Sequence, residues 1–561
     1  MTRARSLSLD PQRYRFDAQN SVWLPREAPA EFRYTDGDSV ELRLLQWLRG
    51  TADRSVLSMP LRAGIVDWPS RYHLSPRRAN LLRPIESLFR GAAVLEIGAG
   101  CGAMTRFMAE SGAQVMALEG SPQRAAVTAA RCAGLDCVTV VADALDRLPV
   151  QASFDVATLI GVLEYARIFF PAPAGVDPVD AMLAHVRRHL RPGGTLVLAI
   201  ENQLGLKYFA GANEDHVAAP MFGIEDRYRR DGVVTFGRAE LARRLNDAGF
   251  TRQRWLYPFP DYKLPVSVLS EAGLRSGVDL TPLLAASVVA DPQPIPRHLF
   301  SLEQAWRTVW RNGLAADLAN SFLVLAELEP ASDGPPNPDV LAWHFAAERR
   351  PVFAKSVSLH TTAAGIVAES RRLDPTATAP LDVALSQRLD DAPFVAGELW
   401  QGALLRLLNE PGWTRAELVD WARRWLDCVE RRLGHPLAEA GAAGLKGDWI
   451  DAVPRNLIID GDRAEFIDLE WVPHQGIAPA HLLYRGILLS LLAASSIAAP
   501  ADPADLKALD LFIAIAAALG HPLSADDLAA CHEAERAFQW QVNGVEWISF
   551  EELLGHKWVL R

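Results

Sequence analysis

The chain has 561 residues, of which 49% are hydrophobic and 22% are charged. That mixture is typical of globular domains and argues against a largely disordered chain, and the length predicts about two to four domains. Lys and Arg number 57 against 68 Asp and Glu, which gives a formal net charge of −11. This balance disfavours a general nucleic-acid binder, although a local basic groove is compatible with it.

The cysteines and the apolar runs indicate the compartment. The five cysteines are Cys101, Cys132, Cys137, Cys428 and Cys531. They form no CxxC pair with a second pair or a His cluster, so neither a disulfide framework nor a zinc site is expected. The N-terminal residues lack the apolar core of a signal peptide, and Pro and Ser interrupt the most apolar run, residues 486–501. That run is therefore predicted to be a buried helix, and the protein to be cytoplasmic with no transmembrane segment.

Residues 91–275 alternate short β-branched runs with helical stretches, the pattern of a doubly wound α/β sheet. Five runs are predicted to be successive parallel strands: residues 92–98, 114–119, 137–142, 154–160 and 195–200. Ser121 and Pro122 form a helix-start signal, and the RPGG run at 191–194 is a stop and turn. Residues 276–315 are rich in Pro and short of strand pattern, so they are predicted to connect two domains.

A second pattern follows this connector. Residues 321–328 and 340–357 are predicted to form an antiparallel meander, and residues 362–373 a helix. From about residue 415 the chain is mostly helical, with a loop and hairpin at 447–471. The predicted organisation is an N-terminal α/β domain with its cap at 1–275, a connector at 276–315, and an α+β domain at 316–561.

A glycine-rich motif lies at the end of the first predicted strand, where residues 98–102 read GxGxG and Glu96 precedes them. Glycines at such a turn let the backbone approach a ligand closely before the helix begins. The spacing differs from the GxGxxG of dinucleotide-binding enzymes. The next strand ends at Glu119, which suits a ribose diol, and the third ends at Asp143, which can accept a proton from an adenine amine.

These strand ends resemble the class I S-adenosylmethionine-dependent methyltransferases, over residues 91–275. The resemblance implies a Rossmann-like sheet and S-adenosylmethionine as the methyl donor. It implies that the methionine part lies against Glu96, Gly98, Gly100 and Gly102, the ribose against Glu119, and the adenine against Asp143 and Ala144. The polar segment at 68–84 is predicted to cap the donor site through Tyr72 and Arg78, the alternative being a solvated helix with surface arginines.

The acceptor side is expected after the fourth and fifth strands. Glu164 follows the fourth strand, and a polar loop with glycines, residues 201–216, follows the fifth. The sequence does not choose among the polar residues of that loop, which include Asn202, Lys207, Tyr208 and His216. A hydroxyl or amine acceptor would benefit from a base such as Glu164 or His216, whereas a phosphate acceptor is already an anionic nucleophile.

The second domain carries a different constellation. Residues 451–456 read DxxPxN, and Asp468 follows beyond a short hairpin. Phosphoryl transfer needs a carboxylate at the acceptor hydroxyl and oxygen ligands for magnesium, and a kinase catalytic loop places an Asn five residues after its Asp. Asp451 is therefore the candidate catalytic residue, and Asn456 and Asp468 are the candidate Mg²⁺ ligands. Lys355 at a strand end would contact the ATP phosphates, with Glu369 on the following helix as its partner.

These elements resemble the aminoglycoside- and choline-kinase branch of the protein-kinase-like fold, which implies a bilobal α+β domain that uses ATP and Mg²⁺. The chain departs from that pattern in three places. Trp449 and Ile450 replace the usual His-containing pair before Asp451, a glycine-rich nucleotide loop is lacking, and the second metal position reads DLE rather than DFG. A pseudokinase and a helical domain with a chance motif are the open alternatives.

Together the two regions resemble the bifunctional methyltransferase–kinases that terminate bacterial O-antigen polysaccharides, in which the methyl group goes onto a phosphate made by the kinase. The long coiled-coil tail of those proteins is missing, since no sustained heptads follow residue 500. The resemblance implies a glycan or small hydroxylated acceptor, with glycosyltransferases as candidate partners and peripheral association with the inner membrane left open. The alternatives are a methyltransferase with a C-terminal pseudokinase lobe and a non-enzymatic scaffold.

Overall fold

The computed structural model describes residues 9–27, 35, 37–150, 152–293, 295–328, 339–380, 383–440, 444–556 and 558–560. The chain divides into two compact units. Unit 1 contains the described residues of Met1–Tyr208, Asn213–Ser276 and Leu314–Glu348, and unit 2 those of Phe209–Ala212, Gly277–Gly313 and Arg349–Arg561. The two units are described separately.

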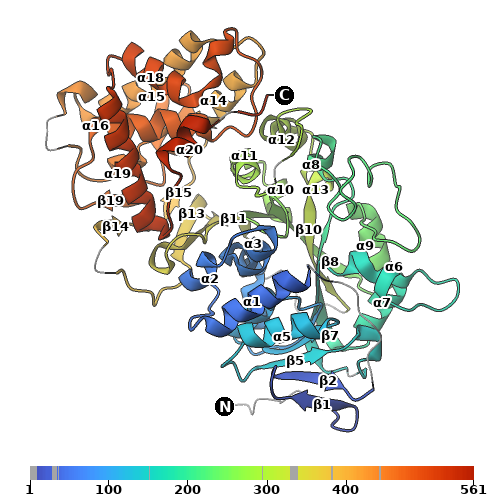
Figure 1. Ribbon diagram of the computed structural model, residues 1–561. Helices are drawn as coiled ribbons and strands as arrows, with labels where there is room; N and C mark the ends of the chain where they lie inside the picture. Colours follow the sequence, from blue (N-terminus) through green and yellow to red (C-terminus); the bar gives the residue numbers. More distant parts are fainter. Residues whose placement is uncertain are drawn as a thin grey trace. The chain divides into compact units, whose positions relative to one another are not determined.

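Unit 1 is built on a sheet whose centre is parallel (Figure 1). The five central strands, in spatial order, are β5 (Val138–Ala142), β4 (Gln114–Glu119), β3 (Ala93–Ile97), β6 (Phe154–Ile160) and β7 (Leu190–Glu201). Each neighbouring pair is parallel, which confirms the five predicted strands and the doubly wound pattern. The prediction of a stop and turn at residues 191–194 is wrong, because β7 begins at Leu190 and includes this run, with a shift of its register against β6 there. Because parallel strands align their carboxyl ends, the residues after β3, β4, β5 and β6 meet at one edge of the sheet.

Helices cover both faces of this parallel core, as buried parallel strands require. In Figure 1, α1 (Asp38–Gly50), α3 (Trp68–Leu74) and α5 (Pro122–Arg131) lie on one side, with α6 (Ala166–Phe169), α7 (Pro178–Arg187) and α9 (Arg238–Asp247) on the other. The predicted helix start at Ser121 is confirmed, because its side chain accepts a hydrogen bond from the Arg124 amide and caps α5. Helix α4 (Ala103–Glu110) follows β3 directly.

Both ends of the sheet carry further strands. The N-terminal hairpin of β1 (Tyr14–Asp17) and β2 (Val22–Pro25) joins the β5 edge, where Trp23 pairs with Val141. On the other side, β10 (Ser321–Glu327) lies antiparallel between β7 and β8 (Arg252–Phe259). Strand β8 pairs with β9 (Ser267–Ser270), which in turn pairs with β11 (Val340–Ala346).

The strands β10 and β11 depart from the predicted domain boundary. The sequence placed residues 321–328 and 340–357 in the second domain, whereas β10 is an inner strand of the unit 1 sheet and β11 pairs with β9. All seven residues of β10 are buried, so its apolar run fits a strand with neighbours on both sides. The predicted connector falls within unit 2, where it forms α11 (Thr281–Val289) and α12 (Leu302–Arg311).

Unit 2 begins with a hairpin in place of a predicted helix. Residues 355–372 form β12 (Lys355–Thr362) and β13 (Gly365–Arg372), which pair antiparallel with Lys355 opposite Arg372. The prediction of a helix at 362–373 is therefore wrong. Gly365 has φ +121°, and the Thr362 hydroxyl donates to the Gly365 carbonyl, so this segment turns instead of continuing as a helix. Strand β15 (Ala392–Pro393) pairs with β13 on its other edge.

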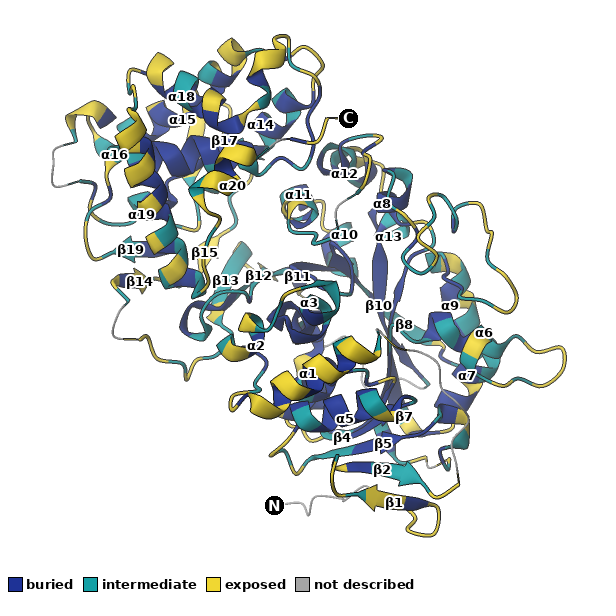
Figure 2. Ribbon diagram, viewed as in Figure 1, coloured by how far each residue is buried: buried dark blue, intermediate teal, exposed yellow. Residues whose placement is uncertain are grey.

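The remainder of unit 2 is mostly helical around one apolar core. Its longer helices are α14 (Trp400–Leu408), α15 (Arg415–Leu433), α18 (Ala508–Ala518) and α19 (Ala525–Asn543), and their inward faces are buried (Figure 2). Two small sheets complete it: β16 (Glu398–Leu399), β17 (Leu457–Asp460) and β18 (Arg463–Phe466) in one, and β14 (Leu385–Gln387) with β19 (Trp471–Pro473) in the other.

The apolar run at 486–501 is helical only in its first part, through α17 (Leu489–Leu492), and Ile487, Leu488 and Leu491 are fully buried in the core of unit 2. Within the described ranges, no helix has the length and apolar character that a bilayer crossing requires.

Candidate functional site

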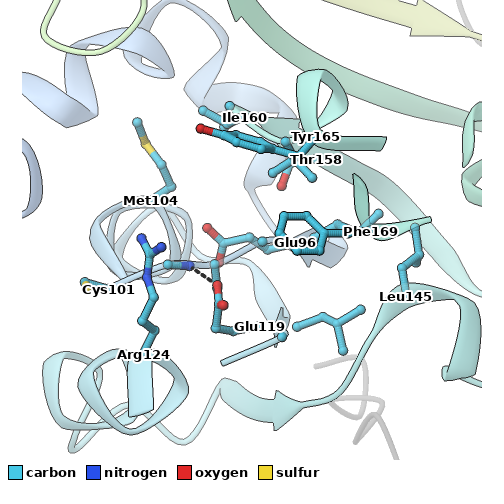
Figure 3. Close-up of a pocket in the computed structure, with 18 of the residues that line it drawn as sticks. Glu96, Cys101, Met104, Glu119, Arg124, Leu145, Thr158, Ile160, Tyr165 and Phe169 are labelled. Atoms are coloured by element: carbon cyan, nitrogen blue, oxygen red, sulfur yellow. Dashed lines mark hydrogen bonds between the residues drawn. The ribbon is translucent and has the colours of Figure 1, made fainter. Parts of the chain in front are cut away.

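A pocket of unit 1 opens at the carboxyl ends of β3, β4, β5 and β6 (Figure 3). Of the donor-site residues predicted from the sequence, those that line it are Tyr72, Arg78, Glu96, Gly98, Gly100, Glu119, Asp143 and Ala144. Gly102 does not line it. Apolar walls come from Met104, Leu145, Ile160 and Phe169. The structure thus brings residues from four consecutive strand ends to one cavity.

The glycine turn between β3 and α4 shapes one side of this pocket. Gly98, Gly100 and Gly102 have φ of +72°, +59° and +79°, a backbone conformation that residues with a Cβ rarely adopt. A Cβ at Gly98 would lie 2.5 Å from Val162 Cγ2, and one at Gly102 would lie 3.0 Å from the Thr128 backbone. Gly102 therefore serves the packing of α4 against α5, and the first two glycines keep the pocket open.

Glu96 places a buried carboxyl beside this turn. Its side chain is 3% exposed and accepts a hydrogen bond from the Thr105 hydroxyl. Burial raises the pKa of Glu96 to about 8, and the nearby Glu119 carboxylate contributes in the same direction, while the Thr105 bond opposes the rise. Near neutral pH the carboxyl is mostly protonated, so a cationic group entering the pocket would favour its ionisation.

Glu119, the last residue of β4, is held by the backbone. One of its oxygens accepts from the Gly100 amide at 2.8 Å, the interaction drawn in Figure 3, and the other accepts from the Ser121 amide at 3.0 Å. Each carboxylate oxygen has a further lone pair. The two backbone bonds therefore fix the carboxylate at the pocket wall and leave it able to accept from ligand hydroxyls.

Asp143, directly after β5, has a partner that the sequence analysis missed. The Tyr14 hydroxyl on β1 donates to Asp143 Oδ2 at 2.9 Å, and the Ala144 amide donates to Oδ1 at 2.9 Å. Burial and the Asp143 carboxylate raise the pKa of Tyr14, which stays a neutral donor. The N-terminal hairpin therefore orients Asp143, and only the pairing of β2 with β5 reveals it.

The segment before β3 closes another side of the pocket. Arg78 is buried, its guanidinium lies 4.2 Å from the centre of the Tyr72 ring, and it donates to the Lys263 carbonyl at 2.7 Å. The alternative of a solvated helix with surface arginines is therefore wrong for Arg78, and also for Arg77, which is buried too. Tyr72 and Arg78 lie together at the pocket, as the cap prediction requires.

A charged cluster lies where the sequence analysis expected the acceptor side. His216 Nε2 lies 3.5 Å from Glu201 Oε2, and Lys263 Nζ lies 2.6 Å from Glu201 Oε1. The hydroxyl of Tyr165, a residue of the pocket wall, lies 3.0 Å from His216 Nδ1. Lys263 and Tyr165 were not singled out in the sequence, and the cluster connects the pocket to the loop after β7.

The candidate residues of that loop separate into two roles. Asn202 donates to the carbonyls of Asp317 and Ala319 at 2.7 Å, which is a structural role at the start of β10. Lys207 lies 2.9 Å from Asp215, and Tyr208 donates to the same carboxylate, so both belong to the charged cluster.

The protonation of this cluster is shifted from ordinary values. Burial raises the pKa of Glu164 to about 8, with the Glu201 carboxylate adding to the rise. For His216, burial lowers the pKa, but Glu201, Glu164 and Glu214 together raise it to about 9. Burial would raise the pKa of Glu201, yet Lys263 and His216 hold it well below its usual range.

Unit 2 brings together Lys355 and the DLE segment. Lys355 Nζ lies 2.6 Å from Asp468 Oδ1 and 3.1 Å from Glu470 Oε2. Arg349 donates two hydrogen bonds to Glu470, at 2.7 and 3.0 Å. The predicted partner Glu369 lies on β13, where it pairs with His360 at 2.9 Å. The assignment of Glu369 to Lys355 is therefore corrected to Asp468 and Glu470.

The DxxPxN segment folds against the same place. Asp451 is buried and accepts a hydrogen bond from the Trp471 amide at 2.8 Å. Asn456 donates to the Asp451 carbonyl at 3.0 Å, and its own carbonyl accepts from the Ile467 amide at 2.7 Å. These bonds connect the loop before β17 to the chain after β18.

Two features of this site are uncommon in purely structural loops. Asp468 has φ +52°, a left-handed conformation that costs a non-glycine residue about 1–3 kcal/mol and clusters at functional sites. Burial raises the pKa of Asp451 to about 7, against the opposing effect of Arg485. Perturbed carboxyl groups of this kind are concentrated at catalytic sites.

Comparisons with known proteins bear on unit 1. Residues 95–196 match a family model described as a methyltransferase domain, and this range runs from β3 into β7. No curated protein matches the chain. Unit 1 therefore contains a methyltransferase domain, as the resemblance predicted, and the match does not reach unit 2.

Solved structures that are similar to part of the chain include three methyltransferases. An S-adenosylmethionine-dependent methyltransferase from Thermotoga maritima, described as a possible histamine N-methyltransferase, is 14% identical, with 45% of this chain and 89% of that chain covered and a TM-score of 0.26. Phosphoethanolamine N-methyltransferase 2 from Haemonchus contortus is 18% identical, with 54% and 61% covered and a TM-score of 0.30. A methyltransferase from Mesorhizobium loti is 19% identical, with 44% and 97% covered and a TM-score of 0.26.

Proposed function

We propose that unit 1 transfers a methyl group from S-adenosylmethionine to an acceptor. The observation that carries this proposal is the convergence of Glu96, Glu119 and Asp143 on one pocket whose floor is a glycine turn. The residues fit the donor, because a Cβ at Gly98 or Gly100 would meet neighbouring side chains, and Glu119 keeps free acceptor capacity.

The roles follow from the chemistry of each side chain. Glu96 would hold the cationic amino group of the methionine part, Glu119 the ribose hydroxyls, and Asp143 with Ala144 would border the adenine. When bound, the donor supplies an already activated methyl group, so positioning is the main task of the chain. Tyr72 and Arg78 would exclude water from the donor by covering its pocket.

We propose further that unit 2 is a phosphotransferase. Asp451 would accept the proton of an acceptor hydroxyl, Asn456 and Asp468 would hold Mg²⁺, and Lys355 would contact the ATP phosphates. The cluster of Lys355, Asp468 and Asp451 supports this, since a catalytic carboxyl works best with a pKa near the operating pH. The alternative is a pseudokinase lobe that binds acceptor or partner without transferring phosphate.

The two activities would act on a glycan or a small hydroxylated molecule, and the phosphate installed by unit 2 would be the methyl acceptor of unit 1. Glycosyltransferase partners remain a prediction from the resemblance, the cytoplasmic location remains a prediction from the sequence, and association with the inner membrane is left open. The test follows labelled methyl transfer to candidate glycans with and without ATP and Mg²⁺. Methylation that requires ATP supports the coupled activities, and equal methylation in both conditions would favour independent domains with a hydroxyl or amine acceptor.

A further inference from the structure

Three side chains from separate elements of unit 1 converge behind the pocket. Glu164 lies on the short helix after β6, Glu201 is the last residue of β7, and His216 lies in the loop that follows. Each offers one ligand atom, and these three atoms all lie within 4.8 Å of one another. The His216 Nε2 to Glu201 Oε2 distance of 3.5 Å is close to the separation of two ligands on one first-row metal ion.

Glu164 points independently to a ligand at this place. Its side chain is 1% exposed, and neither carboxylate oxygen has a hydrogen-bond partner within the part of the chain that the structure describes. A buried carboxyl group without a partner is costly, and buried charges are normally paired or coordinate a metal. A bound cation would satisfy the ionised form of Glu164, and a proton would satisfy the neutral form.

Neighbouring side chains leave one ligand atom of Glu201 and one of His216 facing the centre of the three-residue group. Lys263 Nζ forms an ion pair with Glu201 Oε1 at 2.6 Å, and the other carboxylate oxygen, Oε2, faces His216. The Tyr165 hydroxyl is hydrogen-bonded to His216 Nδ1 at 3.0 Å, and the other ring nitrogen, Nε2, faces Glu201. A ligating imidazole usually has its other nitrogen bonded in this way, and a ligating carboxylate is likewise hydrogen-bonded from outside.

The charges around the group also favour a cation. Glu201 and Asp261 are buried with Glu164, the side chain of Asp215 is 7% exposed, and their partners are two ammonium groups, Lys207 and Lys263. With Glu164 ionised and His216 neutral, as ligation requires, four carboxylates face two ammonium groups, and one divalent ion would balance that deficit. Without the ion, the raised pKa values of Glu164 and His216 mean that bound protons balance the same charges. Glu214 lies nearby as well, but one of its oxygens accepts hydrogen bonds from the backbone amides of His216 and Val217.

We propose that Glu164, Glu201 and His216 bind a first-row divalent cation, of which Mn²⁺ and Zn²⁺ are the probes. An imidazole with two carboxylates suits such ions, and water would complete the coordination. The ion would fix His216 and, through it, Tyr165 at the pocket wall. This positioning role rests on the proposed methyl transfer, whereas the binding of the ion does not.

The experiment titrates Mn²⁺ into the chelator-treated full chain without nucleotide, and follows free Mn²⁺ by electron paramagnetic resonance. Four proteins are compared: the parent, Glu164→Gln, Glu225→Gln and Asp468→Asn. We expect one site per chain that Glu164→Gln weakens at least about tenfold. Glu225 is 58% exposed and provides the matched surface control, and Asp468→Asn separates this site from the proposed magnesium site of unit 2. Both of these variants should keep the parent's affinity at the Glu164 site, because any Mn²⁺ that Asp468 binds belongs to the unit 2 site.

A second measurement needs no variant. Electron spin-echo modulation of Mn²⁺ bound to the parent should show coupling to an imidazole nitrogen, and Zn²⁺ should displace the ion. A Mn²⁺ affinity that Glu164→Gln leaves unchanged would overturn the proposal, and so would bound Mn²⁺ that shows no nitrogen coupling. No saturable binding of either metal would also overturn it, and would assign a proton to Glu164 instead. S-adenosylmethionine binding is measured in the same samples, so a failure of the proposed donor site is distinguished from a failure of the metal site.

Discussion

Glu96 should release its proton when S-adenosylmethionine binds. With a pKa of about 8, the free carboxyl is about nine-tenths protonated at pH 7. A cationic amino group within about 4–6 Å lowers a carboxyl pKa by about 1–3. A fall by about 2 would leave Glu96 about one-tenth protonated in the complex, so binding at pH 7 should release about 0.8 proton from this group. The sign follows from burial, which favours the neutral form that the ligand must ionise.

Isothermal titration calorimetry at pH 7 in two buffers of different ionisation enthalpy counts the protons released. Glu96→Gln is the matched variant, because it keeps the shape and the contact to Thr105 but carries no ionisable proton. The ligand amino group, with an ordinary pKa of about 7.7–8.0, contributes to both proteins alike, so the difference between them isolates Glu96. Equal proton release by the two proteins would refute the assignment of Glu96 to the amino group. If Glu96→Gln does not bind S-adenosylmethionine, the assignment of Glu96 to the amino group would still be refuted by a parent protein that releases no net proton on binding.

Three further changes test the two sites. Gly100→Val should abolish S-adenosylmethionine binding, because φ there is +59° and a Cβ would lie 3.2 Å from Arg124; unchanged calorimetric affinity in a folded variant would contradict this. Glu119→Ala should weaken binding of the same ligand by about 1–3 kcal/mol in calorimetry, as expected for lost hydrogen bonds to a charged group, and a smaller loss would exclude a ribose contact. Asp468→Asn should remove the effect of Mg²⁺ on ATP affinity in a thermal-shift titration and leave methyl-donor binding intact. If Mg²⁺ does not change the ATP affinity of the parent protein, that result would favour the pseudokinase alternative for unit 2.

The parallel core of unit 1 could be predicted because its information is local. Each strand is a short apolar run, each turn carries glycine or proline, and the acids Glu119 and Asp143 stand at strand ends. Alignment of parallel strands then places these ends together without further knowledge. The donor pocket follows from the same pattern, since the predicted residues that line it come from successive strand ends.

The parts that escaped prediction depend on pairing between distant segments. Tyr14 reaches Asp143 only because β2 joins the edge of the sheet at β5, and Lys263 reaches Glu201 only because the chain after β8 returns to the end of β7. The apolar pattern of β10 is that of a buried strand in any sheet, so the sequence could not tell which sheet it enters. Its assignment to the second domain was the consequence.

In unit 2 the spacing of residues predicted the loop but not its ion pairs. Asn456 bonds to the Asp451 carbonyl and to the Ile467 amide, because a DxxPxN turn and a hairpin are compact local structures. The partner of Lys355 was taken from a segment whose apolar spacing was interpreted as helical, although that segment forms β13. Short amphipathic segments fit both periods, and cross-strand pairing with β12 decides between them.

Both sites contain left-handed backbone, at glycines in the unit 1 pocket and at an aspartate in unit 2. This contrast bears on the phosphotransferase site proposed for unit 2. At Gly98 and Gly100 the conformation costs little, because glycine tolerates it, and a Cβ at these positions would meet Val162 or Arg124. At Asp468 the same region of backbone is occupied by a residue with a side chain, and no bulk requirement explains it, since that side chain is 46% exposed. Glycine would relieve the strain at this position, but it would remove the carboxylate that pairs with Lys355. The backbone strain at Asp468 therefore keeps its carboxylate paired with the buried Lys355.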